Sequence, residues 1–461
     1  MAMNDQYQPN SDSILKKLGE IFGRHRKELF VVGGAVRDRL LGRESYDLDF
    51  ATDALPNEIK RLAALAKPQS MYTVGEKFGT IGLVFDGRTV EITTFRAEQY
   101  VPRSRKPTVT FGASLQGDLS RRDFTINAIA YDVIRGELLD PFGGIRDLRA
   151  GLIRAVGDPA QRFDEDPLRL LRAVRFAAQL GFAIDPQTSQ AIVACKDRLR
   201  TVSQERIAEE LNKILLSPNP AYGARLLVNL GLAEVVLPEI MPMVGLDQGE
   251  YHHKDVFEHT LGVLENTPPD LALRWTALLH DIGKPATKAV RDGRIHFYGH
   301  EMVGADMARE ALTRLKMDNR TINKVVKLVR MHMRGNLYEP DWTDGAVRRL
   351  IREAGDEFDE LLMLSRADIT SHRPQKVEAA LSRVDELEER AARLIEQENV
   401  RQLSSPLDGH ELMAIFKLPP GPWIREVKEF LLAKVLDGEL APDDKGKAEE
   451  YAREFMRQRA A

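Results

Sequence analysis

Two aspartates separated by one leucine follow closely behind a pair of glycines, and this arrangement most constrains how the N-terminal part of the chain folds. The glycines are Gly33 and Gly34, and the acidic segment is Asp47-Leu48-Asp49. On a strand, side chains alternate between faces, so Asp47 and Asp49 share one face and Leu48 takes the other. Carboxylates held side by side repel each other, and a divalent cation stabilises such a pair. The pattern predicts a metal-binding strand beside a glycine turn.

The glycine pair itself predicts a phosphate site. Residues 29–32 read as a short apolar strand, and Gly33 and Gly34 let the backbone turn tightly into a helix that begins near Ala35. Exposed amides at a helix start, with Arg37 beside them, bind phosphate oxygens. Turn glycines or loop acids alone are common. Their combination in strand, turn, helix and strand order indicates a nucleotidyl-transfer site.

Composition limits the class of protein. The chain has 461 residues, 43% hydrophobic and 30% charged, which is enough for about three domains. Because the net charge is −4, the chain as a whole does not attract a polyanion, and any RNA binding must use local basic patches. The single cysteine, Cys195, excludes an internal disulfide and fits a reducing cytoplasm. No run approaches the ~18 apolar residues of a membrane span, so we expect a soluble cytoplasmic protein without a membrane partner.

The periodicity changes along the chain from mixed to helical. We expect a helix at 14–22 and strands near 29–32, 46–51, 80–85, 89–95 and 129–134. Asp86-Gly87-Arg88 joins two of these strands with the chemistry of a hairpin turn. After Gly144 the pattern is helical almost to the end. The predicted domains are an α+β head at 1–155, a helical neck at 156–240, a helical body at 241–373 and a helical tail at 374–461.

A third carboxylate is a candidate for the same metal site. Glu91 lies in an expected strand whose neighbours Val90 and Ile92 face the other side. Glu91 therefore faces the aspartate pair if the two strands adjoin. An ordinary edge-strand acid is equally consistent with the sequence. In a two-metal mechanism the metals lower the pKa of the attacking hydroxyl and stabilise the departing pyrophosphate.

Two further segments carry charges that suit a nucleotide. Arg122 and Asp123 end an Arg-Arg-Asp run, in which guanidiniums suit a triphosphate and the carboxylate suits a ribose hydroxyl. Asp166 and Arg169 are three residues apart on an expected helix and share a face, where they offer acceptors and donors to the edge of a base. A capping acid in a solvated salt bridge is the alternative for this pair.

Together these segments closely resemble the class II tRNA nucleotidyltransferase and bacterial poly(A) polymerase family over roughly residues 20–220. The resemblance implies a polymerase-β-like head of α+β class, followed by an all-α neck, a body and a helical tail. It implies that Asp47 and Asp49 bind catalytic Mg²⁺, with Glu91 as the further candidate, and that Asp166 and Arg169 act as an amino-acid template for C or A. The nucleotide-binding residues expected are Gly33, Gly34, Arg37, Arg122, Asp123, Asn127, Asp166, Arg169, Arg172 and Arg175.

The product is harder to predict than the family. The segment from Arg96 to Phe111 matches the family's flexible loop for adding the final A, with Arg105-Lys106 where a double arginine is usual. We expect CCA addition to tRNA from CTP and ATP. Poly(A) synthesis and A-only addition are the alternatives. The intact Asp47 and Asp49 disfavour a nucleotide phosphohydrolase whose head only binds nucleotide. Intact sets of ligand residue types in both halves of the chain disfavour a non-catalytic RNA-binding scaffold.

A second set of metal-ligand residue types lies in the body. Its members are His259, His280, Asp281, His300, His332 and Asp368. The set resembles the HD phosphohydrolase superfamily, which implies a transition metal such as Ni²⁺ or Mn²⁺ and water-dependent cleavage of a phosphoester. A structural relic is the alternative. Three further histidines, His252, His253 and His296, match nothing in that pattern, and the sequence predicts no oligomeric state.

Overall fold

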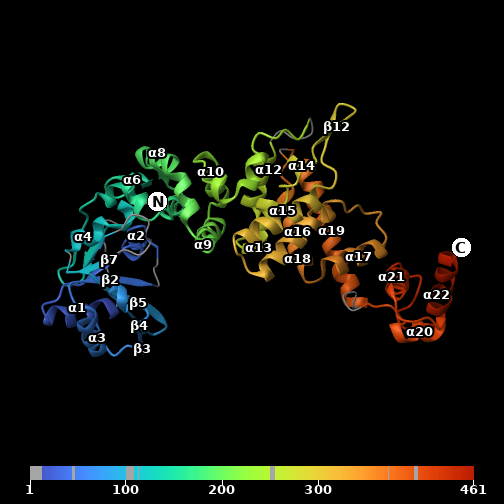
Figure 1. Cartoon of the computed structure of the whole chain (residues 1–461), viewed down its shortest axis with the longest axis horizontal. Helices are drawn as coiled ribbons and strands as arrows, with labels where there is room; N and C mark the ends of the chain where they lie inside the picture. Colours follow the sequence, from blue (N-terminus) through green and yellow to red (C-terminus); the bar gives the residue numbers. More distant parts are fainter. Residues whose placement is uncertain are drawn as a thin grey trace. The chain divides into compact units, whose positions relative to one another are not determined.

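The computed structural model describes residues 13–43, 47–99, 108–112, 114–249, 255–371, 373–398 and 403–460. The chain divides into two compact units, Met1–Pro238 and Glu239–Ala461. The first contains the head and the neck, and the second contains the body and the tail (Figure 1). None of the helices in the described ranges is both long enough and apolar enough to cross a bilayer.

A seven-stranded mixed sheet forms the centre of the head, in the order β3-β4-β5-β2-β1-β8-β9. Its strands are β1 (Phe30–Val32), β2 (Leu48–Thr52), β3 (Ser70–Tyr72), β4 (Thr80–Phe85), β5 (Arg88–Thr94), β8 (Ala130–Asp132) and β9 (Glu137–Leu139). Each of the expected strands is present. The three-residue strands β3 and β9 are too short for a periodicity argument to find. Only β2 and β5 pair in parallel, and the other neighbours are antiparallel.

The expected hairpin is confirmed and sets the register of β5. Asp86 and Gly87 have φ angles of 49° and 78°, and positive φ at both central residues is what a two-residue type I′ turn requires. Side chains then alternate as predicted: Val90 and Ile92 are fully buried. Through the parallel pairing of β5 with β2, Asp49 lies opposite Glu91.

Helices and a second hairpin complete the head. The helices are α1 (Ser13–Arg24), α2 (Gly34–Leu40), α3 (Pro56–Leu65), α4 (Leu115–Ser120) and α5 (Gly144–Ala150). Strands β6 (Arg96–Gln99) and β7 (Thr108–Phe111) pair separately from the main sheet. They are the two ends of the loop predicted to serve final A addition, and its tip at 100–107, with Arg105 and Lys106, lies outside the described residues.

The neck is helical apart from one short strand pair. Its helices are α6 (Pro159–Glu165), α7 (Arg169–Leu180), α8 (Pro186–Cys195), α9 (Gln204–Leu215), α10 (Pro220–Asn229) and α11 (Ala233–Val236). Strands β10 (Leu152–Ile153) and β11 (Ala183–Ile184) pair in parallel, a departure from the all-α expectation. Cys195 is buried at the end of α8, as its apolar surroundings predict.

The second unit is built from helices with one small hairpin. It contains α12 (Val256–Asn266), α13 (Leu271–Leu279), α14 (Lys284–Thr287), β12 (Ala289–Arg291), β13 (Arg294–His296), α15 (His300–Arg314), α16 (Asn319–Asn336), α17 (Asp344–Ala354), α18 (Phe358–Asp368) and α19 (Pro374–Glu398). The tail adds α20 (Gly409–Phe416), α21 (Pro422–Leu436) and α22 (Lys445–Ala460) around a core that includes Leu412, Val427 and Leu431. Residues 272–279 of α13 are all buried, so this helix runs through the middle of the body.

Candidate active site and metal centre

One cavity in the first unit gathers most of the head residues that the sequence predicts. It has a volume of about 540 Å³ and is lined by the main sheet, α2 and the neck helices α7 and α9. The predicted residues that line it are Gly33, Gly34, Arg37, Asp49, Glu91, Arg122, Asp123, Asn127, Asp166, Arg169 and Arg172. Segments far apart in the sequence therefore meet at one place.

The acidic side of the cavity is formed by neighbouring strands. Asp49 and Glu91 lie opposite each other on β2 and β5, which confirms that these strands adjoin. Leu48 is 1% exposed and faces the core, whereas Asp47 and Asp49 are exposed. Desolvation raises the pKa of Asp49; Arg122 opposes the rise, and Glu91 and Asp47 add to it.

This acidic group fits a hard divalent cation. Its donors are carboxylate oxygens only, the type that Mg²⁺ prefers, and mutual repulsion of the kind that raises the pKa of Asp49 is relieved by a bound cation. Asp47 lies just before β2 and does not line the cavity, although its charge acts on Asp49. Asp47, Asp49 and Glu91 would be the residues that hold such an ion.

Gly33 brings the backbone close to an arginine. It has a φ of 75°, and a Cβ at this position would lie 2.9 Å from Arg122 Nη1. Only glycine therefore allows both the turn and this approach. The start of α2 and the Arg122 guanidinium meet at Gly33, which creates the combination of amides and positive charge that the sequence predicts for a phosphate site.

A chain of hydrogen bonds crosses the cavity wall. Arg37 Nη1 donates to Asn127 Oδ1 at 2.8 Å, and Asn127 Nδ2 donates to Asp123 Oδ1 at 3.0 Å. Arg172 donates to Asp123 Oδ2 through Nε, at 2.8 Å, and Nη2. Burial alone would raise the pKa of Asp123, but Arg172 and Asn127 lower it to about 2. The carboxylate is therefore ionised at neutral pH.

Asp123 has no acceptor capacity left over. Its Oδ1 also accepts the backbone N–H of Phe124 at 2.9 Å. Each carboxylate oxygen thus accepts two hydrogen bonds, which fills its two lone-pair sites. In this arrangement Asp123 orients Arg172 and Asn127, and a ribose hydroxyl would have to displace one of its partners.

The helix expected to carry both Asp166 and Arg169 is interrupted, which corrects the prediction. Asp166 is the last residue of the turn that ends α6, with φ −143° and ψ 101°, and α7 begins at Arg169. The reason is Pro167, because the residue before a proline is disfavoured in the helical region. Both side chains still line the cavity.

Neighbouring groups hold this pair in place. Arg169 Nη1 donates to Glu165 Oε2 at 2.8 Å, and Nη2 donates to the carbonyl of Arg121 at 2.8 Å. Asp166 Oδ2 accepts a hydrogen bond from Arg206 Nη2 at 2.9 Å. Sequence reasoning missed Arg206, since it comes from α9 and no local signal connects it to Asp166.

Other cavity residues were also missed, and a second predicted residue, besides Asp47, is absent from the cavity lining. Asp118 and Arg121 line the cavity, and Asp118 pairs with Arg121 Nη2 at 2.7 Å. Arg121 belongs to the Arg-Arg-Asp run and Asp118 precedes it by three residues, which was the available signal. Arg175, expected to bind nucleotide, instead forms a buried ion pair with Glu210 at 3.0 Å.

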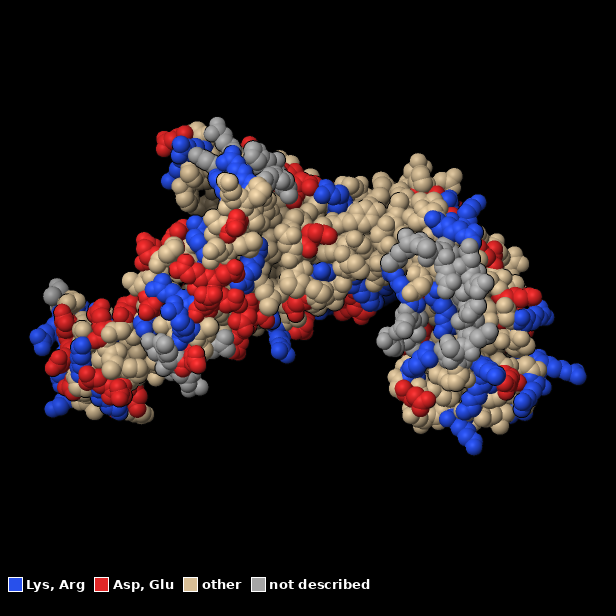
Figure 2. Space-filling view, turned by 180° about the vertical axis from the view of Figure 1, so that it is seen from behind, with Lys and Arg blue, Asp and Glu red and all other residues tan. Residues whose placement is uncertain are grey.

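Arginines surround Phe176, an aromatic residue that lines the cavity. The guanidiniums of Arg37, Arg172 and Arg175 lie 5.1, 5.4 and 4.4 Å from the centre of the Phe176 ring, within range of cation–π attraction. Lys and Arg side chains also gather over the head on the face shown in Figure 2. A local basic surface of this kind suits a polyanion despite the net negative charge of the chain.

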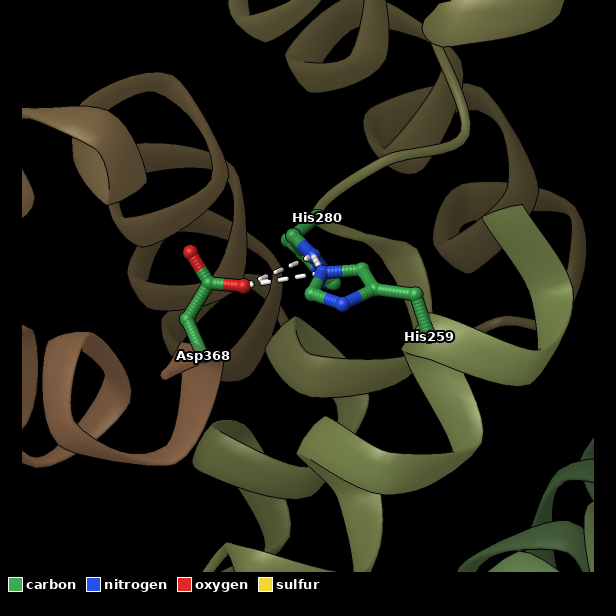
Figure 3. A group of neighbouring side chains, drawn as sticks. All are labelled: His259, His280 and Asp368. Carbon is green, nitrogen blue, oxygen red and sulfur yellow. Dashed lines mark hydrogen bonds and ion pairs between the residues drawn. The ribbon is translucent and has the colours of Figure 1, made fainter. Parts of the chain in front are cut away.

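The second site lies in the body, where ends of three helices converge. His259 comes from α12, His280 follows α13 and Asp368 ends α18, and their side chains point toward one another (Figure 3). His259 Nε2 is 2.9 Å from Asp368 Oδ1 and 3.4 Å from His280 Nε2. These three residues form the first group of potential ligands.

Asp281 connects this group to a second one. Its Oδ2 lies 3.2 Å from His280 Nε2, and its Oδ1 lies 3.4 Å from His300 Nε2. His332 Nε2 is 3.2 Å from His300 Nε2. Asp281, His300 and His332 are the second group, and all three are buried. The structure therefore brings together all six residues of the predicted set, and Asp281 of the second group also contacts His280 of the first.

The ring orientations show that the donor set fits a transition metal. His280, His300 and His332 have Nδ1 at 2.8, 2.7 and 2.7 Å from the carbonyls of residues 277, 297 and 329. His259 Nδ1 lies 2.9 Å from Thr370 Oγ1. Partners outside the site thus leave every Nε2 facing inward, the arrangement typical of metal-binding histidines. Mixed imidazole and carboxylate donors suit transition metals.

Electrostatics keep the bridging group ionised. Despite its burial, His280 and Lys284 hold the pKa of Asp281 well below its usual range. Burial, together with the charge of His280, lowers the pKa of His332 to about 4, so its imidazole is neutral at pH 7. Lys284 Nζ lies 2.8 Å from Asp281 Oδ2; the sequence prediction missed this residue, although its i, i+3 spacing from Asp281 was a usable signal.

Comparison with known proteins agrees with this organisation. Residues 29–154 match the family described as "Poly A polymerase head domain", residues 181–243 match "Probable RNA and SrmB- binding site of polymerase A", and residues 256–373 match "HD domain". The chain is 36% identical to the A-adding tRNA nucleotidyltransferase of Deinococcus radiodurans, over 91% of this chain and 94% of the relative. It is 33% identical to the CCA-adding enzyme of Anoxybacillus flavithermus, over 98% of each.

A solved structure is similar across the whole length. The CCA-adding enzyme of Bacillus stearothermophilus in complex with CTP superposes with a TM-score of 0.71 at 29% identity, covering 98% of this chain and 99% of the other. The match therefore covers both the head and the HD domain. The chain belongs to the family of tRNA nucleotidyltransferases and bacterial poly(A) polymerases, and its nucleotidyltransferase head is joined to an HD domain.

Proposed function

We propose that this enzyme adds C, C and A in turn to the 3′ ends of tRNA, using CTP, ATP and Mg²⁺. The observation that carries the proposal is one cavity in the head, where an acidic strand pair, the glycine turn at Gly33 and the pair Asp166 and Arg169 meet. One cavity that holds both the phosphates and the base can select a nucleotide without a nucleic-acid template.

The residues divide into an acidic and a basic group. Asp47, Asp49 and Glu91 hold the divalent cation, which supplies a lowered pKa for the attacking 3′ hydroxyl and neutralisation of the leaving pyrophosphate. The amides near Gly33, together with Arg37 and Arg122, bind the triphosphate and keep it in line for attack. Asp123, which accepts a hydrogen bond from Asn127, holds Arg172 on the same wall.

Base choice is assigned to Asp166 and Arg169. A carboxylate and a guanidinium side by side offer acceptors and donors to the edge of C or A. Arg206 and Glu165 hold these two side chains from behind, so the recognising atoms are fixed before the base arrives. Fixed groups of this kind favour one geometry of the base over others.

The nucleotides that the enzyme adds to a tRNA end distinguish CCA addition from A-only addition and from poly(A) synthesis. Purified enzyme is given tRNA that lacks its last three nucleotides, with CTP and ATP together and singly, and the extended ends are sequenced. The proposal predicts a product that ends in CCA and then stops. A product with a single A added only to tRNA that already ends in CC would indicate A-only addition, and long A tails on unrelated RNA would indicate a poly(A) polymerase.

We propose a second activity for the HD domain, hydrolysis of a phosphomonoester or cyclic phosphodiester. The observation that favours it is the pair of adjacent ligand groups, which Asp281 connects through its contacts with His280 and His300. Ni²⁺, Mn²⁺ or another transition metal held there supplies a water molecule of lowered pKa. Water oxygen bonds to phosphorus, one P–O ester bond breaks, and the departing oxygen takes up a proton.

Metal analysis and hydrolysis of 2′,3′-cyclic nucleotides test this second activity. Asp281→Ala should lose bound metal and hydrolysis while CCA addition continues, since the two sites share no residue. Asp306→Ala, an exposed residue of α15, is the matched control. Wild-type protein that binds no transition metal and hydrolyses none of these substrates would mark the domain as structural. We place both activities in the cytoplasm, where Cys195 stays reduced.

A further inference from the structure

Four residues on neighbouring strands of the head form one row across the main sheet. Tyr72 on β3 lies opposite Gly82 on β4, and Gly82 lies opposite Glu91 on β5. Glu91 in turn lies opposite Asp49 on β2. Residues directly opposite each other in a sheet present their side chains on the same face. The row therefore places a phenol, a position without a side chain and two carboxylates on one face.

Gly82 leaves room for the aromatic ring of this row. Its neighbours Ile81 and Leu83 are fully buried in the core, so position 82 belongs to the opposite face of the sheet. A Cβ at Gly82 would lie 2.0 Å from both Cε2 and Cζ of the Tyr72 ring, far inside van der Waals contact. The ring therefore fills the space that the side chain of any other residue at position 82 would take.

The tyrosine reaches across Gly82 to the acidic group. The hydroxyl of Tyr72 forms a side-chain hydrogen bond with Glu91. Burial raises the pKa of the Tyr72 phenol, and the negative charges of Glu91 and Asp47 raise it further. The phenol is therefore protonated at neutral pH, so Tyr72 donates this hydrogen bond and the Glu91 carboxylate accepts it.

Tyr72 supports the site from outside the cavity. Glu91 lines the cavity together with Thr80 and Thr93 of the same two strands, whereas Tyr72 does not line it. One hydrogen bond uses one of the roughly four lone-pair sites of a carboxylate and leaves the others for a cation. Partners in this outer position orient the carboxylates that bind metals.

We propose that Tyr72 is a positioning residue of the nucleotidyl-transfer site, which holds Glu91 beside Asp49 so that both carboxylates face one divalent cation before the cation binds. Gly82 is the second part of this arrangement, because a residue without a Cβ lets the ring cross β4. The inference rests on the proposed role of Glu91 as a metal ligand. It explains why an otherwise mobile glutamate can serve on a strand face, since its rotamer is fixed in advance.

The first test measures metal binding without catalysis. Mn²⁺, a paramagnetic substitute for Mg²⁺, is titrated into the full chain without nucleotide or RNA, and electron paramagnetic resonance measures the free ion. All proteins compared carry Asp281→Ala, so that the metal group of the body does not contribute. Tyr72→Phe keeps the ring and loses the hydroxyl. It should raise the Kd for Mn²⁺ about tenfold, as expected for loss of one hydrogen bond to a charged group.

Steady-state kinetics should show a matching separation of constants. In Tyr72→Phe, the Mg²⁺ concentration that gives half-maximal addition of CMP to tRNA lacking its 3′ end should rise about tenfold. The KM for CTP at saturating Mg²⁺ should not change, since Arg37 and Arg122 bind the triphosphate. Tyr222→Phe is the matched control, because it removes a hydroxyl that donates to the carbonyl of Phe182 in the neck, at 3.1 Å. It should leave both constants unchanged.

A double-mutant cycle tests the row itself. Gly82→Ala should weaken Mn²⁺ binding to the same degree as Tyr72→Phe, because the added Cβ displaces the ring. In a Tyr72→Ala background the same Cβ meets no ring, so Gly82→Ala should have no further effect. Thermal melting followed by circular dichroism checks that each variant is folded. Additive effects of the two substitutions, or wild-type Mn²⁺ affinity in Tyr72→Phe, would overturn the proposal.

Glu91→Gln separates failure of this inference from failure of the proposed function. If Glu91→Gln weakens Mn²⁺ binding and Tyr72→Phe does not, Glu91 remains a metal ligand and the positioning role of Tyr72 is refuted. If Glu91→Gln binds Mn²⁺ as tightly as the wild type, Glu91 is not a ligand, and the proposed metal site fails together with the inference. Weaker binding in both variants is the result that the inference predicts.

Discussion

Asp49 and Glu91 occupy directly opposed positions on two parallel strands, β2 and β5, although a helix and two other strands separate them in the sequence. Side chains alternate between the two faces of each strand. A shift of β2 by one residue would turn Asp49 into the core and bring Leu48 into the cavity, and a shift of β5 would do the same to Glu91 and Val90. The sheet register thus positions Asp49 and Glu91 opposite each other.

The first prediction concerns this acidic group. Asp49→Asn should lower nucleotide addition by roughly a thousandfold, since loss of metal stabilisation is worth several kcal/mol and each 1.36 kcal/mol is a factor of ten. Binding of tRNA, measured by fluorescence anisotropy, should be unchanged. Asp86→Asn is the control, because asparagine tolerates the positive φ of that exposed turn. Substantial residual addition by Asp49→Asn would refute the two-metal assignment.

The second prediction separates backbone strain from loss of a phosphate contact. Gly33→Ala and Gly42→Ala both place a side chain at positive φ, but only the first puts a Cβ near Arg122, at 2.9 Å. At Gly42 no atom lies within 4 Å. Steady-state kinetics should therefore show a raised KM for CTP and ATP in Gly33→Ala alone. Equal effects of the two substitutions would mean that Arg122 does not need this close approach.

The third prediction concerns base selection. Arg169→Ala should reduce discrimination between CTP and ATP at each step of addition by about tenfold, as expected for loss of a bidentate base contact of 1–3 kcal/mol. The KM for the correct triphosphate should change less, since Arg37 and Arg122 lie elsewhere on the wall. Glu165→Ala, which removes the partner of Arg169, should give a weaker change of the same kind. A variant that keeps full selectivity would exclude the side-chain template.

The fourth prediction concerns acid stability. The folded pKa of Asp123 is about 2, below the value of about 3.9 in an unfolded chain. Asp123 therefore stabilises the head by about 2 kcal/mol above about pH 4, and this contribution is lost as the pH falls toward 2. Urea unfolding followed by circular dichroism measures the free energy of unfolding of the wild type and of Asp123→Asn. The difference between the two free energies should become smaller as the pH falls from about 4 toward 2. A gap independent of pH would contradict the assignment.

Much of the head could be predicted because its signals are local. The turn at Asp86 and Gly87, and the alternation around Leu48, each depend on a few neighbouring residues. Whether Glu91 faces the aspartates could be stated only conditionally, because parallel pairing of distant strands has no local signal. The prediction of one continuous helix through Asp166 and Arg169 was wrong, and the sequence contains the reason: Pro167 disfavours a helical conformation at the residue before it.

The contacts that hold site residues in place were less predictable. Arg206 reaches Asp166 from a helix forty positions along the chain, and Arg175 turns to Glu210 on that same helix. A periodicity argument places Arg175 on α7 but cannot choose between a cavity and a buried carboxylate. In the body, by contrast, the resemblance to the HD superfamily pattern selected six candidate ligands in advance, and the structure brings all six together.

The central claim, that one cavity serves both C and A addition, is tested most directly by the stoichiometry of nucleotide binding. Isothermal titration should show one CTP bound per chain, and ATP should displace it completely, with Arg122→Ala weakening both to a similar degree. Independent, simultaneous binding of CTP and ATP to the head, unaffected by each other, would contradict the account.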